Sequence, residues 1–354
     1  TFSGTPGEGA RVVATISRNG DLVHRMYLEH KATWPDDPTA LSVGLCERYG
    51  DSLIKEAEIE IGGQRIDKHT SMWNRVYSDL TEFNPTGYFG GNYDGVTNAN
   101  ISDASGTGTL YQLMTGNGYG LSNASSVGIF SASGTVNGFT YKSEASTGGT
   151  TQADGIVVNN IFLPLNFWFC RNPGLALPLI ALQYHEVKVK LTFASKNDLA
   201  RAVTETNAAG GDGTGVDYGG TPTSTEFDLY ADYIYLDTDE RRRFAQVSHE
   251  YLIEQLQISD ATINSTNANI DLNFNHPVKE LIWCTRNTGT AGRNGPIKSG
   301  PTKGDMTAGP VSLAAMGGKW QLKLNGHDRF KERDTRYFTR TQVWQHHTGY
   351  GALP

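Results

Sequence analysis

The chain has 354 residues, more than one hydrophobic core usually fills, so we expect two domains. Hydrophobic residues make up 38%, and the 41 glycines and 13 prolines indicate many turns between short strands, which favours an all-β fold. The formal net charge is -7 and the 30 basic residues are scattered, which argues against the basic surface that direct nucleic-acid binding requires.

Strand patterns run through the whole chain. Apolar and charged residues alternate strictly over 56–61 and 187–191, which is typical of strands with one buried and one wet face. β-branched and aromatic residues predict further strands over Val12–Ser17, Val23–Glu29, Ile161–Phe169, Phe227–Leu236, Tyr251–Ile258, Ile270–Phe274, Glu280–Thr285 and Trp320–Leu324.

Helical patterns are few. Ser71–Leu80 predicts a short amphipathic helix, and Thr238–Ala245 predicts a second one with Thr238 as its N-cap and acidic residues in its first turn. Residues 87–152 and 197–225 are rich in Gly, Ser, Thr and Asn, so we expect two long surface loops there. The apolar runs Ile161–Phe169 and Leu175–Leu182 contain prolines and are too short to cross a bilayer.

A faint internal repeat links the two halves of the chain. Glu58–Asp67 and Gln321–Phe330 are both alternating strands that lead into a Gly-containing turn and then a polar stretch with an Arg. Each copy follows a strand with a similar lead and precedes an aromatic-rich segment. We therefore predict a tandem duplication of one sandwich.

Catalytic, cofactor and metal sites find no support in the motifs. The chain has no GxSxG elbow, no phosphate-binding Walker loop and no HExxH pair, so we expect no enzyme and no cofactor. His346 and His347, on a predicted strand, would point to opposite faces and could not grip one metal. Cys46, Cys170 and Cys284 lie far apart in apolar contexts, which indicates buried free thiols.

The charged segment after residue 236 has two interpretations. Asp237–Glu240 could be read as an acidic metal site, but a helix start is favoured because basic residues follow it directly. Arg241, Arg242 and Arg243 could contact nucleic acid, yet a single triplet in an acidic chain is more typical of salt bridges or an interface.

Asparagine sequons and tryptophans are candidates for glycosylation and for sugar binding. Asn100, Asn123 and Asn264 begin Asn-x-Ser/Thr sequons and are candidate N-glycosylation sites, two of them in the first long loop. The six tryptophans could form sugar-stacking platforms, but most fall on predicted strands or the short helix, so core packing is the favoured use.

Ordered blocks of sequence resemble one family. The stretch Val13–Glu29 (VATISRNGDLVHRMYLE) is followed in order by Ile59–Asp67, Leu163–Phe169, Ala176–Leu182, Asp232–Gln246, His249–Gln255, Asn275–Trp283 and Leu324–Phe330. Together these blocks resemble the major capsid proteins of nucleocytoplasmic large DNA viruses. The resemblance implies a double jelly roll, with residues 1–245 as the first roll, Arg241–Gln246 as a linker helix, and residues 246–354 as the second.

The same resemblance implies a function and partners. Members form homotrimers that serve as pseudo-hexagonal capsomers of an icosahedral shell over an internal membrane, assembled in the host cytoplasm with minor capsid and penton proteins. The family pattern also has strands before residue 1 and after residue 354, so we expect both rolls to lack terminal strands in this chain. Two alternatives stay open: a carbohydrate-binding β-sandwich, such as a host-attachment or lectin-like protein, and a cupin-like jelly-roll enzyme.

Overall fold

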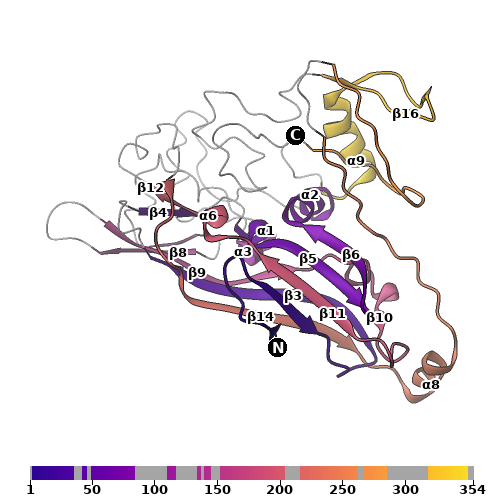
Figure 1. The fold of residues 1–354 in the computed structure, drawn as a ribbon, viewed down its shortest axis with the longest axis horizontal. Coiled ribbons are helices and arrows are strands. Elements are labelled where there is room, and N and C mark those ends of the chain that lie inside the picture. The colour runs from indigo at the N-terminus through magenta and orange to yellow at the C-terminus, as the bar shows by residue number, and fades with distance from the viewer. Residues whose placement is uncertain are drawn as a thin grey trace.

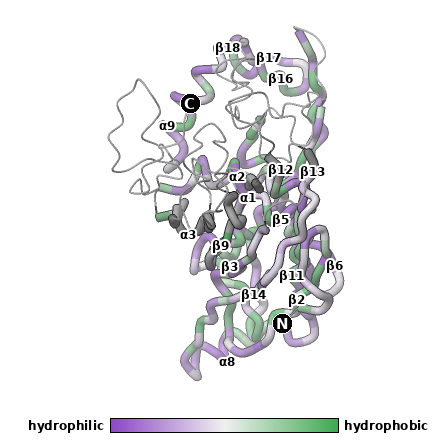
Figure 2. Tube along the Cα trace, turned by 90° about the vertical axis from the view of Figure 1, so that its left-hand side faces the viewer, coloured by the Kyte–Doolittle hydropathy of each residue, from purple (hydrophilic) through white to green (hydrophobic). Residues whose placement is uncertain are grey.

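The computed structural model places a β-sandwich in the first two thirds of the chain (Figure 1). The residues it describes are 2–35, 42–45, 49–83, 110–116, 134–136, 139–144, 152–203, 216–261, 267–284 and 318–349. Two antiparallel sheets stack face to face, and the alternation expected from the sequence is visible as alternating hydropathy along their strands (Figure 2). The all-β fold class is therefore confirmed.

The first sheet contains the most regular alternating sequences. Its order is β1 (Phe2–Ser3), β2 (Arg11–Thr15), β11 (Val187–Phe193), β5 (Ile54–Ile61) and β6 (Gln64–Thr70). Ala57 and Ile59 face the core, while the intervening glutamates of β5 lie opposite basic residues of β11 and β6 on the outer face. Opposite charges on neighbouring strands therefore stabilise the wet face of this sheet.

The second sheet is built on two strands longer than the sequence predicted. β3 (Leu22–Trp34) pairs with β14 (Thr223–Ile234) on one side and with β9 (Gln152–Pro164) on the other, and β10 (Leu177–Pro178) pairs with the start of β3. β8 (Phe139–Glu144) and β7 (Gly134–Val136) extend the sheet beyond β9. The predicted strand Ile161–Phe169 ends early, because Pro164 closes β9 and α5 (Trp168–Arg171) follows.

The two expected long loops contain regular structure. Within 87–152 lie α3 (Leu110–Thr115), β7 and β8, and within 197–225 lie most of α6 (Lys196–Leu199), β12 (Ala200–Val203) and β13 (Val216–Asp217). β12 pairs with β4 (Ser42–Leu45) in a small third sheet. The loop prediction was wrong at these places because their pairing partners are distant in sequence and leave no local signal.

The core lies between the two main sheets. The Phe193 ring from the first sheet packs on the Phe227 ring from the second, with centroids 4.3 Å apart. Trp34 and Trp168 are fully buried, which confirms the expected use of these two rings in packing. Two short helices, α1 (Tyr49–Leu53) and α2 (Ser71–Thr81), pack on each other, whereas the 3-10 turn η2 (Pro173–Leu175) leads into β10 near the start of β3. Within the described ranges, no helix combines the length and apolar character that a membrane span requires.

The second half differs from its prediction. After α8 (Thr238–Gln246), residues 247–261 and 267–284 run extended but form no ladder with the other described residues, so the strands predicted over Tyr251–Ile258, Ile270–Phe274 and Glu280–Thr285 are not found. A strand needs a partner as well as a propensity, and no sequence pattern supplies the partner. Cys284 is exposed here, contrary to the expected burial, whereas Cys170 is half-buried.

A small unit ends the described chain. β15 (Lys319–Trp320) pairs with β18 (Arg333–Asp334), and β16 (Lys323–Leu324) pairs with β17 (His327–Asp328), in place of one strand over Trp320–Leu324. The π-helical turn η4 (Tyr337–Gln342) continues into α9 (Val343–His346), so His346 and His347 lie at a helix end rather than on a strand. Trp283, Trp320 and Phe338 pack together, but Trp344 is exposed.

The predicted repeat is visible as matching hairpins. β5 and β6 are joined by Gly62-Gly63, and β16 and β17 by Asn325-Gly326, each a two-residue turn. All four turn residues have positive φ, between 50° and 84°, a conformation open mainly to Gly, Asn and Asp. A helix follows each hairpin, α2 in the first half and η4–α9 in the second. The two halves therefore share a hairpin–helix unit.

Candidate inter-domain junction and assembly surface

The helix α8 lies at the end of the sandwich opposite α9 (Figure 1). Its N-cap is Asp237, one residue before the predicted Thr238, and the Asp237 carboxylate accepts a hydrogen bond from the Thr238 N–H at 2.6 Å. Asp237, Asp239 and Glu240 thus suit the positive end of the helix dipole, which confirms the helix-start interpretation of this segment.

Arg241 holds α8 to the first roll. Its Nη2 donates to Oδ2 of Asp21 at 2.9 Å, and the same carboxylate oxygen accepts from the Leu236 N–H at 2.8 Å. The hydrogen bond from Arg241, with the one from Leu236, lowers the pKa of Asp21 below its usual value. Arg242 and Arg243 are exposed. Of the predicted triplet, Arg241 therefore serves a salt bridge, and its partner is distant in sequence rather than local.

After α8 the chain runs back along the first roll. Arg171 Nη1 lies 2.8 Å from the Glu254 carboxylate, Gln255 Nε2 donates to the Ile66 carbonyl at 2.6 Å, and the Leu256 N–H donates to Asp67 Oδ1 at 3.0 Å. We call this contact between 254–256 and the β6–α5 edge the clasp. It is made from both side chains and backbone groups.

Arg171 is the polar centre of the clasp. Besides the ion pair with Glu254, its Nε donates to the Asn166 carbonyl at 2.9 Å, and its guanidinium lies 4.6 Å from the centre of the Tyr77 ring. Glu254 also pairs with Lys279. The planar guanidinium therefore joins α5, α2 and the chain after α8 in one network, a role that Lys could not reproduce.

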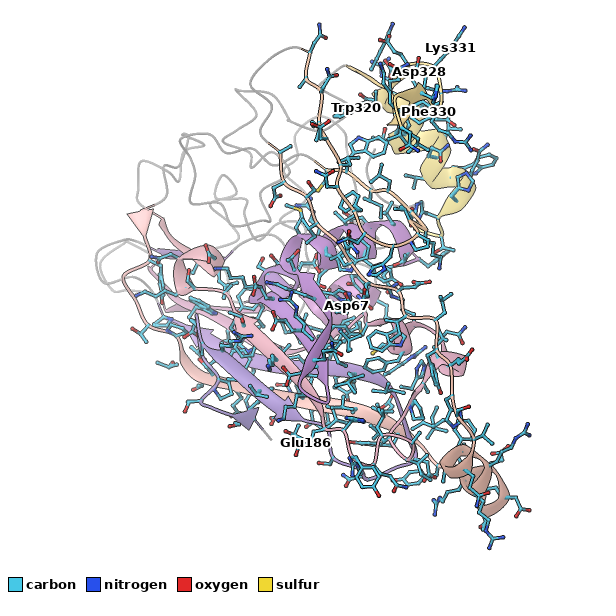
Figure 3. All side chains as sticks on the ribbon, turned by 45° about the vertical axis from the view of Figure 1, so that its right-hand side comes forward. Asp67, Glu186, Trp320, Asp328, Phe330 and Lys331 are labelled. Atoms are coloured by element: carbon cyan, nitrogen blue, oxygen red, sulfur yellow. The ribbon has the colours of Figure 1, made fainter. Side chains whose placement is uncertain are left out.

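Asp67 is the buried member of the clasp (Figure 3). Its Oδ1 accepts from the N–H groups of Lys68 and Leu256, and its Oδ2 lies 2.9 Å from Nε2 of the buried His69. The His69 ring in turn stacks on Phe167, with centroids 4.8 Å apart. A buried carboxylate with these partners fixes where the second half of the chain meets the first roll.

A second contact lies at the C-terminal end of α2. The Gly349 N–H donates to the Leu80 carbonyl at 2.8 Å, and Thr348 Oγ1 donates to the Thr81 carbonyl at 2.6 Å, so both satisfy carbonyls that a helix end leaves open. A Cβ on Gly349 would stand only 2.4 Å from the Asp79 carbonyl oxygen, so only Gly fits this approach. The hairpin–helix units of the two halves thus meet at their ends.

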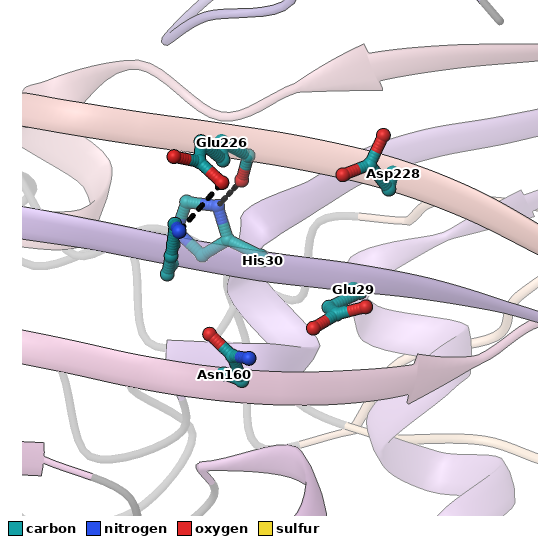
Figure 4. A pocket seen from close by; sticks show the side chains of 6 residues that line it. Glu29, His30, Asn160, Glu226 and Asp228 are labelled. Carbon is teal, nitrogen blue, oxygen red and sulfur yellow. Dashed lines mark hydrogen bonds and ion pairs between the residues drawn. The ribbon is translucent and has the colours of Figure 1, made fainter.

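The outer face of the second sheet carries an aromatic and acidic surface. Tyr230 stacks on Tyr27 at 5.2 Å, and Phe162 meets Tyr27 edge-on at 6.0 Å. Glu29 and Asp228 lie directly opposite each other on β3 and β14, on the same face as these rings (Figure 4). The charge of Glu29 and burial raise the pKa of Tyr230. We call Tyr27, Glu29, Phe162, Asp228 and Tyr230 the acidic aromatic patch.

A neutral hydrogen-bond chain lies beneath this patch. His30 is buried, and Nδ1 faces the Glu226 carbonyl at 3.0 Å, so Nδ1 must donate. Nε2 is then an acceptor for the Tyr49 hydroxyl at 2.9 Å, and Trp34 Nε1 donates to the same hydroxyl oxygen at 3.2 Å. Burial lowers the pKa of His30 to about 3, so the ring stays neutral.

Other predicted sites fall outside these surfaces. Asn100, Asn123 and Asn264 lie outside the described residues, so their use as glycosylation sites stays a prediction. No group of three metal-ligating side chains is found in the ranges that the structure describes. The partner of His347 is a carboxylate: its Nε2 lies 2.7 Å from an oxygen of Glu280.

Sequence reasoning missed the residues that form the clasp. Asp67 and His69 occupy inward positions of β6, where the register with Ala57 and Ile59 would predict apolar side chains. Two polar residues at inward positions were therefore a usable signal of a buried polar contact. Arg171 and Asp21 carried no such signal, because their partners lie 83 and 220 positions away.

Known proteins match both parts of the chain. Residues 1–237 match the family model "Major capsid protein N-terminus", and residues 240–352 match "Large eukaryotic DNA virus major capsid protein". The major capsid protein of Pyramimonas orientalis virus is 42% identical over 98% of this chain, and this chain spans 65% of that protein's length. The major capsid protein of Phaeocystis pouchetii virus is 32% identical over 98% of this chain and 77% of its own length.

A solved structure agrees with the sequence matches. The crystal structure of PBCV-1 VP54, fitted into a cryo-EM reconstruction of the virophage Sputnik, is 31% identical, with a TM-score of 0.62, over 98% of this chain and 72% of that one. This likeness supports the double jelly-roll class that the sequence blocks implied. The chain therefore belongs to the major capsid protein family of large eukaryotic DNA viruses.

Proposed function

We propose that this protein is a structural subunit of an icosahedral virus shell, and that three copies form a pseudo-hexagonal capsomer. The observation that carries the proposal is the shared hairpin–helix unit of the two halves, each with a two-residue turn of positive φ. Two similar units in each copy give six similar sides in a ring of three copies. Family membership supplies the context of a capsid.

The proposed division of the chain follows α8. Residues 1–245 form the first roll and residues 246–354 belong to the second, with Arg241, Arg242 and Arg243 on the helix between them. Two observations support this division: β14 completes the first sandwich just before α8, and the chain after α8 makes contacts of a different kind, through the clasp. The ion pair between Arg241 and Asp21 would then fix the angle at which the connection leaves the first roll.

The proposed partners are other copies of the protein, neighbouring capsomers, and minor capsid and penton proteins, in a shell over an internal membrane that is assembled in the host cytoplasm. Direct nucleic-acid binding is not part of the proposal, because a net charge of -7 opposes it. Names of relatives as capsid proteins support a structural role in the virion rather than an enzymatic one. Burial of Trp34 and Trp168 weakens the sugar-binding alternative.

The test is the assembly state of the full-length protein. Sedimentation velocity should give a single species of three chains, and negative-stain electron microscopy should show hexagonal outlines. A protein that stays monomeric across the micromolar range, or that forms two-fold dimers, would contradict the proposal. Glycan-array binding by such a monomer would instead favour the lectin-like alternative.

A further inference from the structure

We propose that the acidic aromatic patch is the docking surface for residues 318–349 of a neighbouring copy, an inference that rests on the proposed capsomer and adds to it which surfaces meet. We call residues 318–349 the basic module. Within one copy the carboxylates of the patch outnumber their cations, the module carries the complementary charge, and the two surfaces lie in different parts of the molecule.

The patch has two features that are unfavourable in an isolated chain. Three aromatic rings lie in contact on an outward sheet face, and 44% of the Tyr230 surface is exposed. Like charges of Glu29 and Asp228 stand directly opposite each other on paired strands, an arrangement that weakens a sheet. Both features become favourable when a cationic surface covers them, because Tyr rings and carboxylates are good partners of Arg and Lys.

The charge near the patch is not balanced by the roll itself. Lys31 pairs with Glu226, on the adjoining position of the same two strands, and its pKa is raised by Glu226 and also by the charges of Glu29 and Asp228. One lysine therefore faces three carboxylates here. On the outer face of the first sheet, by contrast, each glutamate of β5 pairs with a basic side chain. The face that carries the patch therefore has more carboxylates than paired cations, unlike the outer face of the first sheet.

The basic module carries the opposite charge. It contains seven Lys and Arg side chains, all exposed, and three acidic ones, in a chain whose net charge is -7. Lys319 and Lys323 pair with carboxylates of the module, and Arg333 stacks on Tyr337. The remaining four form no ion pair with any described residue: Arg329, Lys331, Arg336 and Arg340. These cations are available for an intermolecular contact.

The patch and the module lie in different parts of the molecule. In Figures 1 and 2, β3 and β14 cross the lower part, whereas β16–β18 stand at the top beyond the sandwich. Lys331 lies at the outer end of the module in Figure 3, whereas the Phe330 ring packs on Phe338 within the module. The second half of the same copy already occupies the β6 edge through the clasp. A head-to-tail contact between copies, which closes into a ring, joins the two surfaces without disturbing the clasp.

The experiment is a charge exchange in the full-length protein, read by sedimentation velocity. Asp228→Lys should raise the concentration for half-maximal assembly about tenfold or more, since like charges then face each other across the contact. The same change replaces a repulsive cross-strand pair with an attractive one, so the thermal midpoint of the monomer should stay equal or rise. Lost assembly with retained stability separates a contact role from a folding role.

The partner cation is found by combination. Each of the four unpaired cations is changed to Glu, alone and together with Asp228→Lys: Arg329→Glu, Lys331→Glu, Arg336→Glu and Arg340→Glu. At least one double variant should have a half-maximal assembly concentration within about threefold of wild type, since its charges are complementary again. Glu186→Lys and Arg242→Glu are the matched controls, with the same charge changes on exposed side chains outside both surfaces. Both controls should assemble normally.

The outcomes separate the two proposals. If the wild type assembles and Asp228→Lys assembles equally well, the docking surface is wrong and the capsomer stands. If Asp228→Lys fails to assemble but none of the four cations restores it, the patch meets something other than the basic module, and the proposal is again wrong. A wild type that remains monomeric overturns both.

Discussion

Asp67 Oδ1 accepts a hydrogen bond from the Leu256 N–H at 3.0 Å, although the two residues are 189 positions apart. This bond joins the last strand of the first sheet to the chain that follows α8. It is buried on the Asp67 side and shares its acceptor with the Lys68 N–H. Removal of the carboxylate would leave two backbone donors and His69 without their partner.

We therefore expect Asp67→Ala to lower the free energy of unfolding by about 3 kcal/mol, because buried donors lose a charged acceptor. Asp67→Asn keeps an oxygen at this position and should cost about 1 kcal/mol. Chemical denaturation measures both changes in the free energy of unfolding, and hydrogen exchange at the Leu256 amide measures whether the clasp stays closed. Equal protection of that amide in Asp67→Ala and wild type would mean that Asp67 does not hold the clasp.

Arg241 should control the mobility of α8. Arg241→Gln removes the ion pair with Asp21, so we expect faster trypsin cleavage after Arg242 and Arg243 than in wild type. The bond lowers the pKa of Asp21, so the contact is present above the ordinary carboxyl pKa of 3.8 and is lost as the pH falls through the lowered value. Arg242→Gln is the control, judged by cleavage after Arg243, which should be unchanged.

His30 should make the fold sensitive to acid. The unfolded chain takes up a proton at His30 near pH 6.5, whereas in the folded chain the pKa is about 3, so unfolding binds an extra proton between these values. Stability contributed by neutral His30 is therefore full above pH 6.5 and falls by about 3 kcal/mol on acidification to pH 4. Urea unfolding from pH 7 to pH 4 should show a shallower loss for His30→Gln, which can form both hydrogen bonds without titrating. Parallel curves for the two proteins would contradict this.

The two described cysteines should differ in reactivity. Burial raises the pKa of the Cys170 thiol to about 12, so almost no thiolate is present at pH 8, whereas Cys284 is exposed. Brief treatment with iodoacetamide followed by peptide mass spectrometry should label Cys284 and spare Cys170. In denaturant the two peptides should be labelled equally; labelling of native Cys170 at the rate of Cys284 would show that its site opens readily.

Local patterns predicted the elements whose structure is decided locally. Strict alternation located β5 and β11, the amphipathic pattern located α2, and the capping residues located α8, the two helices to within one or two residues. The strands predicted over Tyr251–Ile258 and Ile270–Phe274 have the same propensity but no partner among the described residues, and β8 lies in a Gly- and Ser-rich stretch yet pairs with β9. Pairing between distant segments decides both cases, and composition does not report it.

The candidate surfaces also depend on pairing between distant segments, which the sequence does not report. Arg241 could be assigned to a salt bridge from composition, but its partner Asp21 could not be named. The predicted strands contain Tyr27, Glu29 and Asp228, although the observed strands have different bounds. Each of the three residues has the outward position that strand alternation assigns to a polar or half-exposed side chain. Only the register of β3 against β14 brings the two carboxylates opposite each other and makes a surface of them.

The connection beyond α8 is held in part by side chains that stand in for a ladder. Gln257 donates through Nε2 to the Asn275 carbonyl and accepts through Oε1 from the Asn275 N–H, both at 2.9 Å, as an opposing strand would do with its backbone. A backbone ladder changes register only as a whole, because every pair slips together. The clasp that joins the two halves is likewise made of individual contacts, through Glu254, Gln255 and the Leu256 N–H. Such contacts can be exchanged one at a time, so the orientation of the second half relative to the first is open to gradual change in evolution while the sandwich itself stays fixed.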